Sequence, residues 1–183
     1  MAKNSLGLIE LSSIASGFAV TDAMLKTADV ELVLARTICS GKYMVLIGGD
    51  VAAVQAAVET GRDTANFALI DSFVIPNVHA DVFPAIAGTS RVTALEALGV
   101  LESFTVASLI EGADAMVKSA NVKLIEVRLA MALGGKAFAT ITGSVSAVRS
   151  ALDSGAQAVG RKGLLVNKVL IPNPRPELLQ EMI

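Results

Sequence analysis

The residue best suited to chemistry in this chain is its single cysteine, Cys39, in the segment RTICSGK at residues 36–42. Apolar, strand-like runs at residues 30–38 and 43–47 flank this segment, so we expect a tight turn with an exposed thiol at its tip. Gly41 supplies the backbone freedom that a turn needs, and Ser40 and Lys42 suit a solvated position. The alternative is a buried, inert cysteine, because free cysteine often behaves as a small hydrophobic residue.

One thiol cannot build a metal centre by itself, since structural zinc and iron-sulfur centres need three or four protein ligands. Only a symmetric oligomer could bring several copies of Cys39 together. Lys42 could favour the thiolate, but a free, solvated lysine is the expected state. His79, the only histidine, has Asp81 alone near it at metal-site spacing, so we expect it at a surface or an interface. With no nucleophile constellation readable, the sequence does not indicate an enzyme.

The composition indicates burial beyond the core of a monomer. Hydrophobic residues make up 53% of the 183 residues and the mean hydropathy is +0.63, yet charged or polar residues interrupt every apolar run before it could span a membrane. We therefore expect extensive subunit contacts. The net charge of −2 without a basic stripe argues against a nucleic-acid partner. The lack of a signal-peptide pattern and the single cysteine favour the cytoplasm.

The elements that would position Cys39 occur twice. GLIE at residues 7–10 returns as GVLE at 99–102, DAMLK at 22–26 returns as DAMVK at 114–118, and IPN at 75–77 returns at 171–173. This repetition predicts two copies of one folding unit. We place the boundary in the small, polar loop near residues 87–90, which gives domains 1–90 and 91–183.

Each copy is expected to run strand, helix, two strands, helix, strand. In the first copy the strands fall near residues 6–11, 30–38, 43–47 and 68–75, and the first helix near 16–28. Asp50 is well placed to cap the second helix, as is Ser144 in the second copy. This order is the β-α-β-β-α-β pattern of ferredoxin-like folds, so we predict an α/β sandwich (α+β) in each half.

These repeated motifs, with GDVAAV at residues 49–54 and IPNPRPE at 171–177, resemble the shell-protein domain of bacterial microcompartments from nearly end to end of the chain. Two tandem domains resemble the trimeric class, in which three chains form a six-domain disc beside neighbouring shell proteins. The resemblance implies a structural shell protein located in the microcompartment shell in the cytoplasm. In that family, the turn between the second and third strands lines a central pore.

Cys39 in that turn makes the chain similar to the iron-sulfur members of propanediol-utilisation shells. The resemblance implies one shared 4Fe-4S cluster per homotrimer, held by Cys39 of three subunits, with the fourth iron lacking a cysteine ligand. Thr37, Ile38, Ser40 and Gly41 would frame this site and line the pore. The matching turn of the second copy lacks cysteine, and Leu133, Gly134 and Gly135 would line the pore there, although they also suit an ordinary glycine turn.

The resemblance also implies contacts at the tile edge. Lys26 and Lys118 match the family's edge lysine, and Arg175 resembles an arginine that inserts into an adjacent tile. A solvated helix face is the alternative for both lysines. In the first copy Val78 and His79 replace the Pro-Arg pair, so that edge must differ.

Three hypotheses for function follow. The first is a structural tile whose cluster transfers electrons across the shell or is delivered to an enclosed or cytoplasmic redox enzyme. The second is a tile with a metabolite-conducting pore and no cluster. The third is a soluble, ferredoxin-like oligomer that binds a small ligand between subunits.

Overall fold

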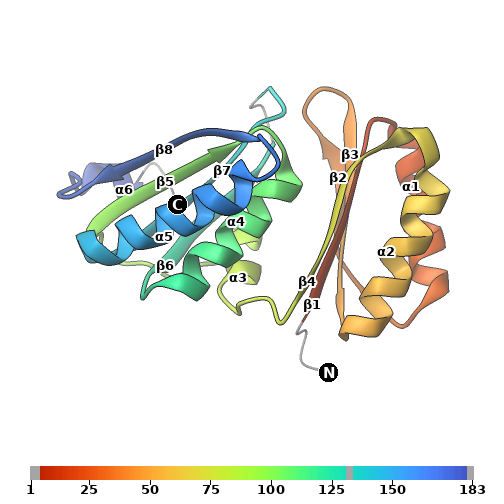
Figure 1. Ribbon diagram of the computed structural model, residues 1–183, viewed down its shortest axis with the longest axis horizontal. Helices are drawn as coiled ribbons and strands as arrows, with labels where there is room; N and C mark the ends of the chain where they lie inside the picture. The colour runs from red at the N-terminus through yellow and green to blue at the C-terminus, as the bar shows by residue number, and fades with distance from the viewer. Residues whose placement is uncertain (1–4, 131–133, 181–183) are drawn as a thin grey trace. The chain divides into compact units, whose positions relative to one another are not determined.

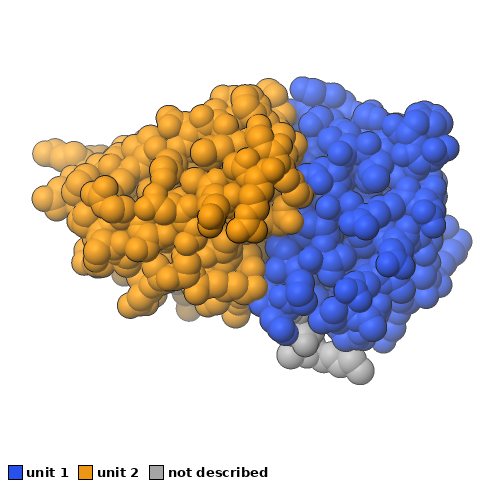
Figure 2. All heavy atoms as spheres, in the orientation of Figure 1, with its two compact units in different colours: residues 1–78 blue, residues 79–183 orange. Residues whose placement is uncertain are grey.

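The structure is a computed structural model that describes residues 5–130 and 134–180, and the chain divides into two compact units, Met1–Val78 and His79–Ile183. Figure 2 colours the two units separately. The sequence had placed the division near residue 90. The division falls earlier because a short helix, α3 (Val82–Ala87), packs against strand β6 (Lys123–Leu129) of the second unit. No pattern in the sequence had indicated α3.

Unit 1 has the expected β-α-β-β-α-β order. Its elements are β1 (Ser5–Leu11), α1 (Ile14–Thr27), β2 (Glu31–Ile38), β3 (Lys42–Gly49), α2 (Val51–Ala65) and β4 (Leu69–Pro76). The strands form one antiparallel sheet in the order β2-β3-β1-β4. Both helices lie on the same face of this sheet (Figure 1). The ferredoxin-like prediction is confirmed for this unit.

Unit 2 repeats the arrangement after α3. Its further elements are β5 (Ala97–Ser103), α4 (Val106–Ser119), β6, β7 (Ala137–Gly143), α5 (Val145–Gly160), β8 (Leu165–Ile171) and a final short helix, α6 (Glu177–Gln180). The sheet order is β6-β7-β5-β8, which matches unit 1 strand for strand. The prediction of two tandem α+β units is therefore confirmed.

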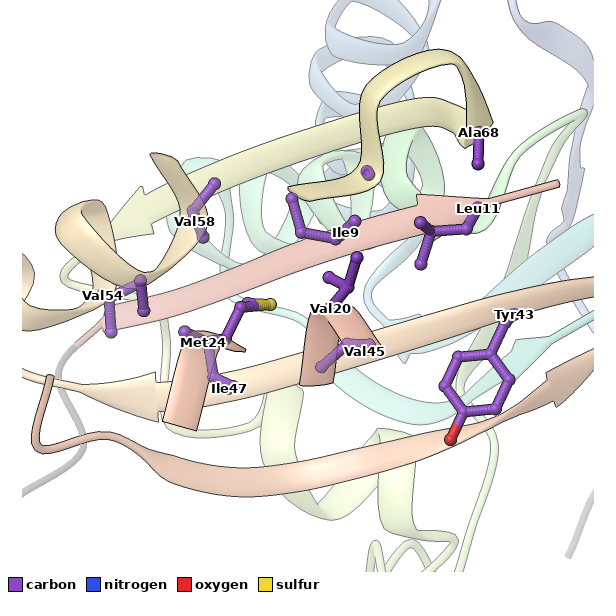
Figure 3. Packing of buried hydrophobic residues seen from close by; sticks show 12 residues of the cluster. Ile9, Leu11, Val20, Met24, Tyr43, Val45, Ile47, Val54, Val58 and Ala68 are labelled. Atoms are coloured by element: carbon purple, nitrogen blue, oxygen red, sulfur yellow. The ribbon is translucent and has the colours of Figure 1, made fainter. Parts of the chain in front are cut away.

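The core of unit 1 lies between the sheet and its two helices. Ile9 and Leu11 of β1 and the alternate residues of β3 from Tyr43 to Ile47 point toward Val20 and Met24 of α1 (Figure 3). Gly7 lets α2 approach β1 closely, because a Cβ there would lie 2.7 Å from side-chain atoms of Val54 and Val58.

The predicted helix caps are confirmed. The carboxylate of Asp50 accepts the backbone N–H of Ala53 at 3.0 Å, and the hydroxyl of Ser144 accepts that of Ala147 at 3.3 Å. These caps satisfy amides that the first turn of a helix leaves without partners. Because of these caps, only the capping residue separates the end of β3 from the start of α2, and the end of β7 from the start of α5.

Candidate metal-binding turn and assembly surfaces

Cys39 lies at the tip of the β2–β3 hairpin. Ile38 and Lys42 are the last paired residues, so only Cys39, Ser40 and Gly41 form the turn. Ser40 and Gly41 have positive φ angles of 66° and 70°, which explains why a glycine follows the serine. The predicted turn is thus confirmed, whereas Cys39 is half-buried instead of fully exposed.

An ion pair that the sequence did not predict lies beneath this turn. The Lys42 ammonium is 3.0 Å from Oε1 of Glu10, whose side chain is fully buried, while the side chain of Lys42 is 22% exposed. The expectation of a free, solvated lysine is therefore wrong. Oε2 of Glu10 has no hydrogen-bond partner among the described residues, so Lys42 is the only cation that compensates this buried carboxylate there.

The second hairpin contains the same ion pair in a more open setting. Lys136 lies 2.8 Å from Oε1 of Glu102, and these side chains are 43% and 30% exposed. Its turn is longer and begins at Ala130, whose φ is 47°, and it includes Gly134 and Gly135 with φ of 62° and 87°. Leu133 lies outside the described residues. A glutamate in the first strand and a lysine after the turn recur in both copies, and this repetition is the sequence signal that could have predicted the ion pair.

The residues expected to frame Cys39 fall into two groups. Thr37, Ser40 and Gly41 are exposed around the tip of the hairpin. Ile38 is only 5% exposed, so its side chain packs inward in the isolated chain. The surface that this turn presents is therefore made of small polar groups and backbone, together with the half-buried thiol.

The two lysines expected at tile edges lie in different surroundings. Lys26 pairs with Asp22 at 2.6 Å, and both side chains are mostly exposed, at 74% and 63%. Lys118 pairs with Asp114 at 2.5 Å, but Asp114 is only 8% exposed and also accepts the backbone N–H of His79 at 2.8 Å. Lys118 therefore belongs to a contact that holds the start of unit 2 to α4, whereas Lys26 remains at the surface.

Arg175 lies on the segment that follows β8. Its guanidinium makes two hydrogen bonds to the carboxylate of Glu177, the shorter at 2.8 Å, and both side chains are well exposed. This contact lowers the pKa of Glu177 below its usual value. In the isolated chain Arg175 thus has an internal partner that a neighbouring tile would have to replace.

A stripe of apolar side chains on α1 was not predicted. Ile14, Phe18 and Leu25 recur on one side of the helix and are 39%, 65% and 39% exposed. At the repeat-related positions of α4, the side chains are buried; they are Val106, Ile110 and Val117. The apolar side chains of α1 are therefore exposed, whereas the repeat-related side chains of α4 are buried.

The side chains that could ligate a metal are dispersed over the described part of the chain. Within the described part of the chain, no three side chains of His, Cys, Asp or Glu lie close enough to share a metal ion. His79 instead accepts a hydrogen bond from the backbone N–H of Asp81 through Nδ1 at 3.2 Å.

Among residues 5–130 and 134–180, no helix is both long and apolar enough to cross a lipid bilayer.

Comparison with known proteins extends the similarity through both units. Residues 5–78 and 97–174 each match the family described as the BMC domain. The bacterial microcompartment shell protein PduT of Citrobacter freundii is 44% identical over 179 residues, which cover 98% of this chain and 97% of that protein. The carboxysome assembly protein CcmO of Synechococcus elongatus is 31% identical over 97% of this chain and 68% of its own length. A crystal structure of a microcompartment protein from Desulfitobacterium hafniense DCB has a TM-score of 0.91 and 46% identity, covering 98% of this chain and 99% of that one.

Proposed function

Since the chain belongs to the bacterial microcompartment shell proteins and is a structural protein of such a shell, we propose that three copies form one tile with a central 4Fe-4S cluster. Cys39 of each copy supplies one thiolate ligand. The tile neither makes nor breaks bonds in a substrate, and its lateral partners are other shell proteins. Family membership leaves no reason to retain the hypothesis of a soluble ligand-binding oligomer.

The observation that carries the proposal is the position of the single thiol. Cys39 lies at a hairpin tip in one of two repeated units, and the matching turn of the second unit has no cysteine. A threefold assembly therefore collects three thiolates around its axis and not six. Iron-sulfur clusters are held by thiolates, usually four, so one iron is left for a ligand from outside the tile.

The residues of the hairpin suit this role. The turn is short and is closed by the paired residues Ile38 and Lys42, and the buried Glu10 fixes the Lys42 side chain beneath it. The sulfur is thereby carried at the tip of a short hairpin at one end of the sheet. A short, closed turn suits a thiolate that must be placed beside the same thiolate of two other copies. When bound, such a cluster supplies one-electron redox chemistry. The chain's own contribution is to place the thiolates and to limit access through the exposed Thr37 and Ser40.

The apolar stripe on α1 supports the oligomer. Ile14, Phe18 and Leu25 are exposed, although the corresponding side chains of α4 are buried. Because α1 and α4 are repeat-related, the surface that covers α1 in the tile is best supplied by a second copy of this chain. Such a head-to-tail contact forms a closed ring of three copies when each copy is rotated by a third of a turn from the one before it. This also accounts for the high apolar fraction of the sequence.

Two uses of the cluster are consistent with this site: electron transfer across the shell, and delivery of the cluster to a redox enzyme. Delivery of the cluster would require an iron that can exchange an outside ligand, so it depends on the missing fourth cysteine, whereas electron transfer would require only that a partner come close to the cluster. The competing hypothesis is a pore that conducts metabolites, with Cys39 only lining it. It differs from the proposal in a single measurable respect, the iron content.

The test is anaerobic purification from iron-replete cells, with iron and acid-labile sulfide measured per chain. We expect brown wild-type protein, colourless Cys39→Ser protein and brown Thr37→Ala protein, with all three eluting at the size of a trimer. Thr37→Ala is the matched control because it changes an exposed residue of the same hairpin, two positions before the thiol, and leaves Cys39 in place. Colourless, iron-free wild-type protein would remove the cluster and leave the metabolite-conducting tile.

A further inference from the structure

The end of the unit 1 sheet farthest from Cys39 carries three exposed carboxylates. Glu31 begins β2 and pairs with Gly48, and Asp50 follows β3 as the cap of α2. The backbone of Asp29 lies beside Gly49, because a Cβ on that glycine would be 3.6 Å from the carbonyl oxygen of Asp29. The three carboxylates therefore gather at one sheet end, where Glu31 also has a further contact within the chain.

The repeat-related end of unit 2 has lost all three of these charges. Asn121, Lys123 and Ser144 occupy the three positions, and all three side chains are exposed. They line a shallow hollow of about 300 Å³ that also includes Glu96 and the start of α5. Among the described residues Lys123 has no ion-pair partner, so its ammonium is available at this hollow.

Lys123 also borders a second hollow, of about 200 Å³, which contains a second cation. Arg91 and Ser90 line it, together with Asp81. Arg91 forms no ion pair within the described part of the chain, and Oγ of Ser90 is buried there with no hydrogen-bond partner. Two cations and a hydroxyl thus lack partners around Lys123, although the carboxylates of Asp81 and Glu96 lie in the same hollows.

The location of these ends indicates what they meet. Strand β2 runs from Glu31 to Ile38, roughly 23 Å at the usual rise per residue, and Cys39 follows immediately. If the Cys39 turn faces the threefold axis, the Glu31 end faces the rim of the tile. If the β6–β7 turn of unit 2 faces the same axis in the proposed tile, six rim positions alternate between an acidic end from unit 1 and a Lys123 end from unit 2.

We propose that the acidic end of unit 1, formed by Asp29, Glu31 and Asp50, binds the hollow around Lys123 of unit 2 on a neighbouring tile. This inference rests on the proposed trimeric tile but not on the cluster. Contact between two acidic ends would bring six carboxylates together, so the charges select unlike units and fix the rotation of one tile against the next. The contact also gives Arg91, which is exposed, an acceptor that the described part of the chain does not supply.

A charge-swap experiment tests this assignment. Assembly of purified trimers into sheets is followed by sedimentation and electron microscopy at low and moderate salt. We expect Lys123→Glu and Glu31→Lys each to raise the concentration needed for assembly by about threefold or more. The double variant exchanges the two charges between the ends and keeps the net charge of −2, so we expect it to assemble nearly as wild type does. Added salt should weaken wild-type assembly because exposed charges are screened.

Two controls make the same charge changes at other exposed positions, Arg161→Glu after α5 and Glu59→Lys on α2. Both should leave the assembly concentration unchanged. Single variants that assemble as wild type does, or a double variant no better than the singles, would overturn the proposal. So would a thermal shift with inorganic phosphate alone that Lys123→Glu abolishes while assembly is unaffected, since that result identifies a small-anion site. The trimer mass and iron content are measured on the same samples, so a missing cluster is distinguished from failed lateral contact.

Discussion

The ammonium of Lys42 and the fully buried carboxylate of Glu10, 32 residues apart in the sequence, meet at 3.0 Å beneath the turn that carries Cys39. The pair joins the first strand to the hairpin, and it lies on the sheet face opposite the helices.

The first prediction concerns this pair. Lys42→Met leaves Glu10 buried without its cation and should lower the free energy of unfolding by about 2–4 kcal/mol. Lys136→Met makes the same change at the partly exposed pair of unit 2 and should cost only about 0–1 kcal/mol. Urea unfolding of both variants measures the difference. Equal losses would mean that burial of Glu10 does not determine the energy of its ion pair.

The second prediction concerns packing of α1 on the hairpin. A Cβ at Gly17 would lie 2.3 Å from the ring of Tyr43, which is nearly fully buried, so Gly17→Ala should destabilise by about 1–3 kcal/mol. Gly160→Ala is the control, because no atom lies within 4 Å of a Cβ there. That change should be neutral or stabilise by up to about 1 kcal/mol, since alanine favours a helix. Thermal unfolding measures both, and a stable Gly17→Ala variant would show that the two elements can separate.

The third prediction is a pH dependence at Glu126 on β6. Burial raises the pKa of this carboxyl above its usual value, although Arg128 at 2.8 Å acts in the opposite direction. Between the unfolded and the folded pKa, the folded chain binds more protons, so this group's contribution to stability falls as pH rises through that window. Glu126→Gln should therefore gain stability relative to wild type between pH 4 and pH 7, measured by urea unfolding. A difference that stays constant over this range would contradict the assignment.

The fourth prediction separates the two lysines expected at tile edges. Lys26→Ala should change the free energy of unfolding by less than about 0.5 kcal/mol, because its pair with Asp22 is exposed. Lys118→Ala should cost about 1–2 kcal/mol, because Asp114 is nearly buried. In sheet-assembly assays Lys26→Ala and Arg175→Ala should weaken lateral contacts and leave the iron content unchanged. If Lys118→Ala were as stable as Lys26→Ala, the hydrogen bond from the His79 backbone N–H would be enough to stabilise the buried Asp114 carboxylate without Lys118.

Local patterns in the sequence predicted much of the fold. The duplicated motifs gave two units, and Asp50 and Ser144 marked helix starts because a side-chain cap depends on residues three positions away. Gly41 marked the turn at Cys39 for the same local reason. Helix α3 escaped notice because six residues, VFPAIA, are too few to show a helical period.

The features of the site that escaped prediction depend on distant residues. Glu10 meets Lys42 across 32 positions, and Asp114 meets His79 across 35, so neither contact follows from local pattern. The half-burial of Cys39 likewise depends on neighbours that a turn motif does not specify. The opposite charges at the repeat-related positions Glu31 and Lys123 can be read from the sequence. That each lies at the end of its sheet away from the hairpin turn follows only from the strand pairing.

The central claim is that three copies of Cys39 share one cluster, and native mass spectrometry of anaerobically purified protein tests it most directly. We predict one dominant species with the mass of three chains plus a single 4Fe-4S cluster, which becomes three bare chains in Cys39→Ser. A wild-type trimer carrying no iron or sulfide would contradict the claim, as would a cluster that Cys39→Ser retains.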